Sequence, residues 1–312
     1  MIICCGEALI DMVPIKDISL SQGNASAYQP ISGGAIFNTA IALGRLGVTT
    51  GFLSGLSNDL FGQQLCNSLE DSGVNYSYSY RTDAPTTLSF VKLVNGQASY
   101  AFYDENTAGR LLELSDVPHL PATTQVLHFG AISLIPEPCG STYEALMKRE
   151  CANKVISFDP NIRTSFINDE ASYRNRINRM LDMSDIVKIS DEDLDWLAPG
   201  INIDDFASHL LNNSCSLVLY TKGARGATAY SKNFKCFEPS LQVEMIDAIG
   251  AGDSFNAGVL ASLDHQNFLN KSQLRALSDE QIRTALKQGN EVAAFTVTQT
   301  GSNPPWKNQI NI

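Results

Sequence analysis

Apolar segments alternate with helix-like segments through much of the chain. Four of these segments have the character of buried strands, at 126–135, 155–160, 185–190 and 217–223, and each precedes residues with helical spacing. Near-continuous apolar strands separated by helices are typical of a parallel sheet covered on both faces. The pattern therefore predicts an α/β fold with a mostly parallel central sheet.

The N-terminal part follows the same order. The apolar run 2–10 predicts a central strand, and 48–56 predicts another. Residues 34–46 and 58–73 carry apolar positions at helical spacing, and each segment ends at or next to a glycine, which is a common helix stop. This part thus extends the strand–helix alternation.

One hairpin interrupts the alternation. Residues 87–94 and 97–103 alternate between apolar and polar positions on either side of Asn95-Gly96. An Asn-Gly pair between two such runs is a strong hairpin signal. We therefore expect a small antiparallel sheet that is inserted into, or attached to, the parallel one.

Composition and charge disfavour several classes of function. The 312 residues are 44% hydrophobic and 18% charged, as in a globular protein. A net charge of −11 without a basic run disfavours nucleic acid, and no apolar stretch reaches the roughly 18 residues of a membrane helix. The four histidines lack metal-ligand spacing. Seven cysteines without a C-x-x-C pair, and no signal peptide, predict a cytoplasmic protein.

Polar residues that follow strands are the first candidates for binding, because ligands of parallel sheets lie beyond the carboxyl ends of the strands. The planar guanidinium of Arg163 suits a phosphate or a carboxylate, and the alternative is an exposed ion pair. The positions of this kind are Asp11, Asn161, Arg163, Ser190 and Thr221.

The strongest chemical signal is DAIGAGDSFN at 247–256. Gly250 and Gly252 precede residues with helical spacing, so they lie at a helix start. Free N–H groups and the helix dipole favour a phosphate there, and glycine allows its close approach. Asp253 beside that anion is unfavourable unless it accepts a proton from an attacking hydroxyl. The alternative is that Asp253 only caps the helix and the glycines form a turn.

A second glycine pair, Gly33-Gly34, also precedes a helix. Asn38 lies one turn beyond Gly34, and its amide suits a polyhydroxylated ligand as donor and acceptor. The alternative is a tight turn with a satisfied asparagine. No dinucleotide fingerprint is present, and GARG at 223–226 lacks the ending of a Walker A motif.

Together, GGAIFNTAIALGRLG (33–47) and DAIGAGDSFNAG (247–258) resemble the two signature segments of the ribokinase-like (pfkB) carbohydrate kinases, and they lie about 210 residues apart. The order of elements between them is similar to that family over nearly the whole chain. The resemblance implies a single kinase domain over 1–312 with a ribokinase-like three-layer α/β/α fold. It also implies a small β-sheet lid from about 12–31 and 84–106, which covers the sugar and often forms a homodimer interface.

The resemblance implies roles for individual residues. Asp253 would be the general base that deprotonates a sugar hydroxyl, and the backbone of Gly250, Ala251 and Gly252 would form the anion hole for the γ-phosphate of ATP. The residues that would hold the sugar are Asp11, Gly33, Gly34, Asn38, Phe102, Asn161 and Arg163. Those beside ATP would be Lys188, Ser190, Thr221, Gly223, Gly226 and Asn290.

Two metal ions are implied as well. Mg²⁺ would accompany ATP, with Asp193 in contact through water, and K⁺ is an expected activator. The monovalent-cation loop would consist of Asp247, Ile249, Thr296, Gln299 and Gly301. The sequence departs from the family at two points: Ile36 replaces a proline of the first signature, and the N-x-x-E segment is Ser190-Asp191-Glu192-Asp193. Which carboxylate serves Mg²⁺ therefore stays open.

The substrate is narrowed by three segments, GEALIDMVP (6–14), FDPNIR (158–163) and KISDEDL (188–194), which most resemble bacterial fructokinases. Asp104 follows Phe102-Tyr103, and a carboxylate there disfavours an anionic sugar acid. We therefore expect phosphorylation of fructose to fructose 6-phosphate. The alternatives are 2-keto-3-deoxygluconate, a ribonucleoside or an aminoimidazole riboside as the substrate, or a sugar- or nucleotide-binding regulator without catalysis.

Overall fold

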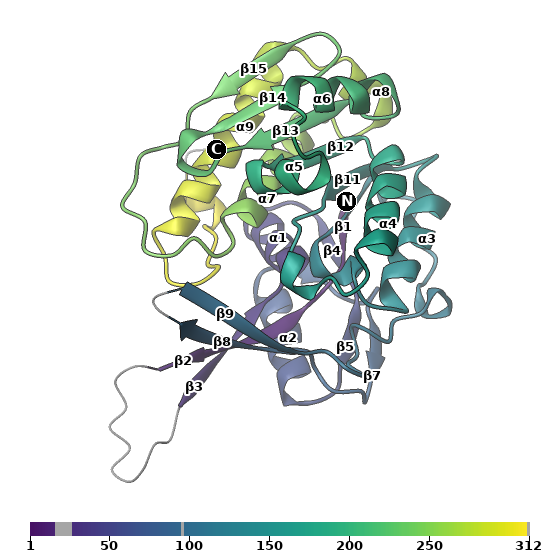
Figure 1. Cartoon of the computed structure of the whole chain (residues 1–312), viewed down its shortest axis with the longest axis vertical. Coiled ribbons are helices and arrows are strands. Elements are labelled where there is room, and N and C mark those ends of the chain that lie inside the picture. The colour runs from purple at the N-terminus through teal and green to yellow at the C-terminus, as the bar shows by residue number, and fades with distance from the viewer. Residues whose placement is uncertain (16–26, 95–96, 311–312) are drawn as a thin grey trace.

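The computed structural model describes residues 1–15, 27–94 and 97–310 (Figure 1). A nine-stranded sheet forms its centre, in the order β15-β14-β13-β12-β11-β10-β1-β4-β6, and all neighbouring pairs are parallel except those made by β14 and β15. The strands are β1 (Ile2–Cys5), β4 (Thr50–Leu53), β6 (Val74–Asn75), β10 (Val126–Gly130), β11 (Val155–Asp159), β12 (Ile186–Ser190), β13 (Leu217–Thr221), β14 (Ala227–Tyr230) and β15 (Lys235–Glu238).

Helices cover both faces of this sheet, as the apolar pattern predicts. The α-helices are α1 (Ala35–Arg45), α2 (Leu60–Asp71), α3 (Cys139–Glu150), α4 (Glu170–Asp182), α5 (Asp191–Leu197), α6 (Ile203–Asn212), α7 (Ala251–His265), α8 (Lys271–Arg275) and α9 (Asp279–Val297). The short 3₁₀ turns are η1 (Leu114–Asp116), η2 (Ala131–Leu134), η3 (Thr164–Phe166), η4 (Gly223–Arg225) and η5 (Lys307–Gln309).

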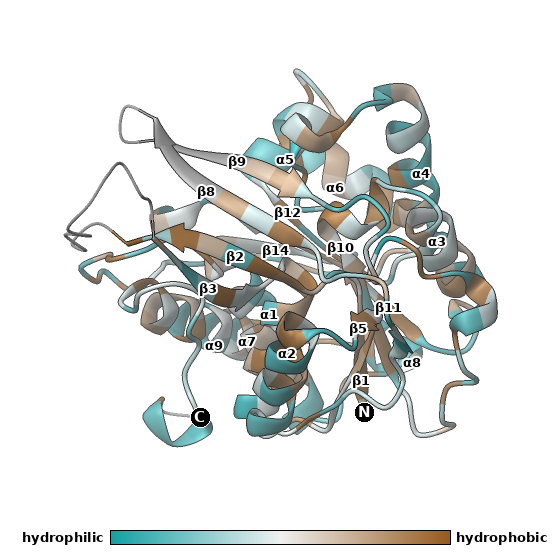
Figure 2. Cartoon of the chain, turned by 90° about the horizontal axis from the view of Figure 1, so that it is seen from below, coloured by the Kyte–Doolittle hydropathy of each residue, from teal (hydrophilic) through white to brown (hydrophobic). Residues whose placement is uncertain are grey.

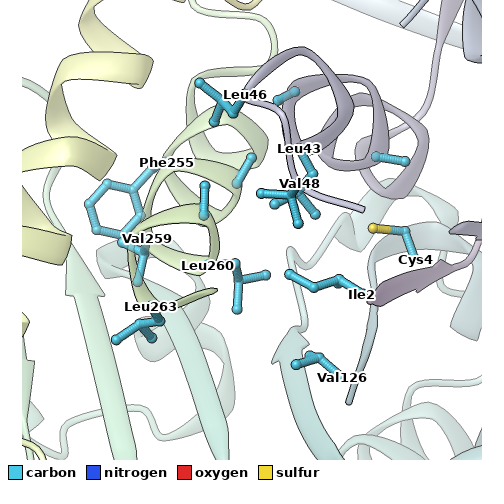
Figure 3. Packing of buried hydrophobic residues seen from close by; sticks show 14 of the residues in the cluster. Ile2, Cys4, Leu43, Leu46, Val48, Val126, Phe255, Val259, Leu260 and Leu263 are labelled. Carbon is cyan, nitrogen blue, oxygen red and sulfur yellow. The ribbon is translucent and has the colours of Figure 1, made fainter. Parts of the chain in front are cut away.

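The core has two halves, one on each face of the sheet. Ile2 and Cys4 of β1 pack in the cluster that contains Leu260 of α7 (Figure 3), whereas Ile3 and Cys5 belong to the cluster on the other face. Alternate residues of a strand point to opposite faces, so a strand that is buried on both sides must be apolar throughout. This two-sided burial explains the continuous apolar runs in the sequence.

A second, four-stranded sheet lies beside this body (Figure 2), and we call it the small sheet. Its order is β3-β2-β8-β9; the outer pairs are antiparallel and β2 runs parallel to β8. Its strands are β2 (Leu9–Pro14), β3 (Tyr28–Gly33), β8 (Leu88–Val94) and β9 (Gln97–Tyr103), and a separate pair joins β5 (Gly55–Ser57) to β7 (Tyr80–Thr82). β8 and β9 lie inside the expected segment 84–106, and β2 and β3 overlap the expected segment 12–31 at its two ends. Residues 16–26 and Asn95-Gly96 fall outside the described residues.

Two expectations from the sequence were wrong in detail. The run 2–10 is not one central strand, because the chain turns after Cys5 and enters the small sheet at Leu9; Asp11 therefore lies inside β2 and not after a central strand. The segment 217–223 leads into antiparallel β14, not into a helix. Gly223 and Gly226 have φ values of 51° and 106°, which let the chain reverse tightly there.

Candidate active site

The start of α7 is a helix end without a side-chain cap. Gly250 occupies the N-cap position in the left-handed region, with φ 78°, and no side chain accepts a hydrogen bond from the first turn. In the described part of the chain, the N–H groups of Gly252 and Asp253 have no acceptor within hydrogen-bonding distance. The turn therefore offers two free donors and the positive end of a helix, which suits an anion.

Asp253 lies in that first turn and is buried, with 7% of its surface exposed. Its Oδ2 accepts a hydrogen bond of 2.9 Å from Nδ2 of Asn38 on α1. Burial raises the pKa of Asp253 to about 7, and the bond from Asn38 opposes that rise. A carboxyl group with such a pKa can accept a proton near neutral pH, as a general base must.

The start of α1 differs, because a protein carboxylate already occupies it. Oε1 of Glu7 accepts hydrogen bonds from the N–H groups of Ala35 at 2.8 Å and Ile36 at 3.3 Å. A proline at position 36 would lack the second donor, so Ile36 fits this cap. Sequence reasoning missed Glu7, although an acidic residue inside an apolar run is a signal of a buried, paired carboxylate. Gly34, with φ 110°, packs against the backbone of Glu7.

Residues of the small sheet face this region. Asp11, Ser89 and Phe102 lie side by side on one face by strand register, and a Cβ on Gly33 would lie 2.5 Å from Oδ2 of Asp11. Burial raises the pKa of Asp11, and a hydrogen bond with Ser89 opposes the rise. The structure thus brings Asp11 and Gly33 together.

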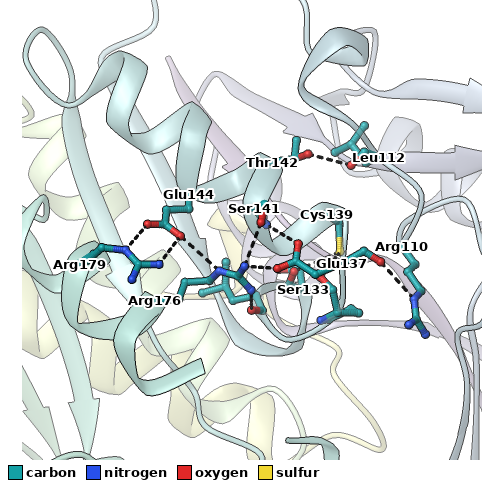
Figure 4. Close-up of polar contacts among 12 residues, drawn as sticks. Arg110, Leu112, Ser133, Glu137, Cys139, Ser141, Thr142, Glu144, Arg176 and Arg179 are labelled. Carbon is teal, nitrogen blue, oxygen red and sulfur yellow. Dashed lines mark hydrogen bonds and ion pairs between the residues drawn. The ribbon is translucent and has the colours of Figure 1, made fainter. Parts of the chain in front are cut away.

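A cavity of about 580 Å³ lies next to this face, between the small sheet and α4. Phe102 lines it and packs against Phe166, with the ring centroids 4.9 Å apart and the rings tilted by 44°. Figure 4 shows its charged wall, where Arg176 contacts Glu137 and the main-chain oxygen of Glu137 accepts from Arg110 at 3.4 Å. Arg110 also pairs with Asp104 at 3.3 Å. Both arginines are thus already paired with carboxylates of the wall.

The segment after β11 carries Asn161 and Arg163. Asn161 adopts φ 41°, a left-handed conformation that asparagine tolerates. Arg163 is exposed and donates to the carbonyl oxygen of Ile162 at 3.1 Å; among the described residues it forms no ion pair. The guanidinium is therefore available, but neither residue lines the cavity.

Lys188 of β12 is buried beneath the start of α7. Its Nζ lies 3.0 Å and 3.3 Å from the two oxygens of Asp159, the last residue of β11. Nδ2 of Asn256, on α7, donates to the same carboxylate at 2.7 Å. Asp159 and Asn256 were not predicted as site residues, because a contact across the sheet and α7 leaves no local pattern in the sequence.

On the expected ATP side, Ser190 caps α5 and binds Asp193. Oδ2 of Asp193 accepts from the N–H and the hydroxyl of Ser190, and Oδ1 accepts from the N–H of Ile162 at 2.8 Å. Asp193 therefore fixes the local backbone, with one acceptor position of Oδ1 left over.

The other expected ATP residues lie in the turn after β13 and on α9. Thr221 pairs with Ser190 in the sheet, and among the described residues that are not its direct neighbours in the chain, none has an atom within 4 Å of a Cβ built on Gly223. Asn290 is buried and donates to the carbonyl oxygens of Glu238 and Pro239 at 3.2 Å and 3.1 Å. Its amide thus holds the loop after β15.

The expected cation loop is partly assembled. Oδ1 of Asp247 accepts from the N–H of Ile249, and Oδ2 accepts from the N–H of Gly301, both at 3.0 Å. Thr296 is buried in α9, and its carbonyl oxygen accepts from the N–H of Gln299 at 3.0 Å. The buried hydroxyl of Ser302 lies against Gly250 and has no hydrogen-bond partner in the described chain. No group of three or more metal-binding His, Cys, Asp or Glu side chains occurs in the described chain.

The family model described as pfkB family carbohydrate kinase matches residues 1–309. The chain belongs to this family. A fructokinase of Rhizobium leguminosarum bv. trifolii is 54% identical to this pfkB kinase over 283 residues, which are 91% of this chain and 86% of that protein.

Solved structures agree with the family. Fructokinase from Xylella fastidiosa with bound ATP has a TM-score of 0.87 at 29% identity, covering 96% of this chain and 93% of that one. A double mutant of fructokinase from Vibrio cholerae O395, bound to fructose, ADP and a potassium ion, has a TM-score of 0.82 at 26% identity, with the same coverage. The fold is therefore ribokinase-like, as predicted, and the chain is a carbohydrate kinase.

In the parts of the chain that the structure describes, no helix is both long and apolar enough to cross a membrane.

Proposed function

We propose that this protein is an ATP-dependent fructokinase that transfers the γ-phosphate of ATP to the 6-hydroxyl of fructose. The observation that carries the proposal is the buried Asp253 carboxylate beside two free N–H donors at the start of α7. The similarity to fructokinases supports fructose as the sugar.

In the proposed mechanism, Asp253 accepts the proton of the attacking hydroxyl while Asn38 fixes the orientation of its Oδ2. The N–H groups of Gly252 and Asp253 donate to oxygens of the transferring phosphoryl group. Phosphoryl transfer needs positioning and charge stabilisation more than covalent help. The Gly250–Gly252 turn supplies the donors, and burial of the site keeps water away.

The sugar is proposed to lie between the start of α1 and the small sheet, with Asp11, Gly33 and Asn38 as its polar contacts. Gly34, Phe102, Asn161 and Arg163 complete the proposed sugar site. The small sheet acts as its lid, and the two arginines of the cavity wall are neutralised by Asp104 and Glu137, which disfavours a sugar acid. This arrangement supports a neutral sugar.

ATP is proposed to lie along the turn after β13. Thr221, Gly223 and Gly226 border that turn, with Lys188, Ser190 and Asn290 nearby. Mg²⁺ bound with ATP would offset the charge of its phosphates. The free acceptor position of Asp193 fits a water-mediated contact with that ion. Asp247, with the carbonyl groups of Ile249, Thr296, Gln299 and Gly301, would hold a potassium ion.

A second copy of the chain is the proposed partner of the lid. The face of the small sheet opposite Phe102 carries Tyr28, Phe90 and Tyr103, whose rings pack edge to face at 5.3 Å and 5.5 Å. Tyr103 is 60% exposed. An exposed aromatic group of this kind favours a homodimer.

All seven cysteines are free thiols, which supports a cytoplasmic location.

The proposal is tested by an ADP-release assay over a panel of fructose, 2-keto-3-deoxygluconate, ribonucleosides and aminoimidazole riboside. Ribosides belong in the panel because the cavity beside Phe102 has room for more than a hexose. The proposal requires the highest kcat/KM on fructose. A higher value on another sugar would reassign the substrate, and ligand binding without turnover would point to a regulator.

A further inference from the structure

The Gly250–Gly252 turn is contacted from below by a buried positive charge. A Cβ added to Gly252 would lie 3.2 Å from Nζ of Lys188, so glycine at this position admits the ammonium group as well as any ligand above it. An ammonium has three donors, and the oxygens of Asp159 take two. In the described chain, the third has no protein acceptor.

The charges around this turn are otherwise negative. The carboxyl groups whose charges raise the pKa of Lys188 are those of Asp159, Asp193 and Asp253. His128, on β10, which lies on the other side of β11 from Lys188, stays neutral at physiological pH, because burial and then Lys188 lower its pKa to about 3. An incoming phosphoryl group would thus meet three carboxyl groups and one cation, and its binding depends on the position of that cation.

The geometry of Lys188 is set by two residues that the proposed mechanism does not use. Asp159 is 2% exposed and Asn256 is 3% exposed. Asn256 follows Asp253 by three positions on α7, so it lies on the same side of the helix. Its amide and the Lys188 ammonium both bind the Asp159 carboxylate, which therefore connects β11, β12 and α7 at the Gly250–Gly252 turn.

A purely structural role explains this arrangement poorly. Buried ion pairs contribute little net stability, because desolvation of both charges offsets their attraction. Burial alone would lower the pKa of Lys188, yet the charges of Asp159, Asp193 and Asp253 raise it, so the lysine stays charged. A permanent cation in a buried site that receives phosphate has a direct electrostatic use.

We propose that Asp159 and Asn256 are positioning residues that hold the Lys188 ammonium under Gly252, where its charge stabilises the transferring phosphoryl group. This inference rests on the proposed kinase function. It differs from a simple role of Lys188 in ATP binding, because the stabilisation acts on the developing charge of the transition state and therefore on kcat.

The test compares K188M, D159N and N256A with the wild type. We expect kcat to fall about 100–1,000-fold in K188M, as for the loss of one donor to a reacting oxyanion. We expect a fall of about 10–100-fold in D159N, as for the loss of a residue that orients another, and a smaller fall in N256A. The KM values for sugar and ATP should stay within about threefold of the wild type.

The pH profile separates this role from a structural one. The Lys188 charge lowers the pKa of Asp253 and the Asp159 charge raises it. The acid limb of the kcat profile should therefore move to higher pH in K188M and to lower pH in D159N. A general loss of packing would not move the acid limb in opposite directions in the two variants.

The matched control is D204N, which removes the carboxylate of the Lys235–Asp204 pair, an Asp–Lys pair with both side chains more than half exposed. Its kcat should equal that of the wild type. Melting temperatures check the fold, and if D159N does not fold, K188M and N256A carry the test. The inference would be overturned if folded K188M kept a kcat within threefold of the wild type. It would also be overturned if the only defect of K188M were a higher KM for ATP. A wild-type protein inactive on every sugar would instead overturn the proposed function.

Discussion

The two glycine-led helices of this protein start in different ways. At the start of α1, Glu7 accepts hydrogen bonds from the N–H groups of Ala35 and Ile36, and the helix end is closed by the protein itself. At the start of α7, the N–H groups of Gly252 and Asp253 have no acceptor in the described chain. Glycines before a helix therefore do not define an anion site; the absence of an internal carboxylate cap does.

The difference also separates the tasks of the two ends. The closed end, which is the start of α1, presents side chains such as Asn38 to a neutral ligand. The open end, which is the start of α7, presents backbone N–H donors to a charged ligand. The hydrogen bond from Asn38 to Asp253 joins them, so the sugar and the phosphoryl group would meet at the base.

The largest effect should come from Asp253→Asn. An amide cannot accept the proton of the attacking hydroxyl, so kcat should fall by about 1,000-fold or more while ATP still binds. Steady-state kinetics and calorimetric ATP titration measure the two quantities. D264N on the last turn of the same helix is the control and should keep its kcat. Near-normal turnover of D253N would remove Asp253 from the role of base.

The same variant should change how stability depends on pH. Burial raises the folded pKa of Asp253 from 3.8 to about 7, so the folded protein keeps a proton that the unfolded chain loses. The stability that this gives is fully present below the unfolded pKa of 3.8 and is lost as pH rises from there through the folded pKa of about 7. D253N should therefore be more stable than the wild type at pH 8, by about 2–4 kcal/mol. The difference in stability between D253N and the wild type should disappear near pH 4. Chemical denaturation at both pH values measures it, and a constant gap would contradict the raised pKa.

Adding one methyl group at each turn should separate the two tasks. G252A places a Cβ against Lys188 at the open end, and kcat should fall about 10–100-fold with the sugar KM unchanged. G33A places a Cβ against Asp11, and the sugar KM should rise about tenfold with kcat kept. Neither position has a positive φ, so alanine fits both backbones. If both variants changed the same parameter, the comparison of the two ends would fail.

The smallest effect should come from Glu7→Ala. Loss of the cap leaves the N–H groups of Ala35 and Ile36 without an acceptor, which should cost about 1–2 kcal/mol of stability. The sugar KM should rise moderately, because Gly33-Gly34 adjoins the uncapped turn. N202A removes the cap of α6, away from the site, and should lower the melting temperature without changing KM. A KM change of equal size in N202A would show that the effect is indirect.

Much of this arrangement follows from local sequence. The helix after DAIGAG, the hairpin strands around Asn95-Gly96 and the two-sided sheet are set by patterns a few residues long. The path of the chain after Cys5 was predicted wrongly, because Leu9 and Ile10 are apolar in the small sheet for the same reason that Ile2 and Ile3 are apolar in the central one. Periodicity cannot tell which sheet a short apolar run joins.

The charged part of the site was the harder part to predict. Glu7, Asp159 and Asn256 act through partners that lie 28, 29 and 97 positions away along the chain. Asp193 illustrates the same limit: its carboxylate accepts hydrogen bonds from the N–H groups of Ile162 and Ser190 and from the Ser190 hydroxyl, and the bond from Ile162 joins residues 31 positions apart. Such pairs arise from tertiary packing and leave no spacing to read.

The hydrogen bond between Asn38 and Asp253 spans 215 positions of the chain. During synthesis, α1 leaves the ribosome long before α7 exists, so the base and the group that orients it cannot meet until most of the polypeptide has emerged. Translation products that stop before Asp253 would have the sugar-facing half without the reacting half. The pair that would perform the reaction therefore forms only after α7 has been made.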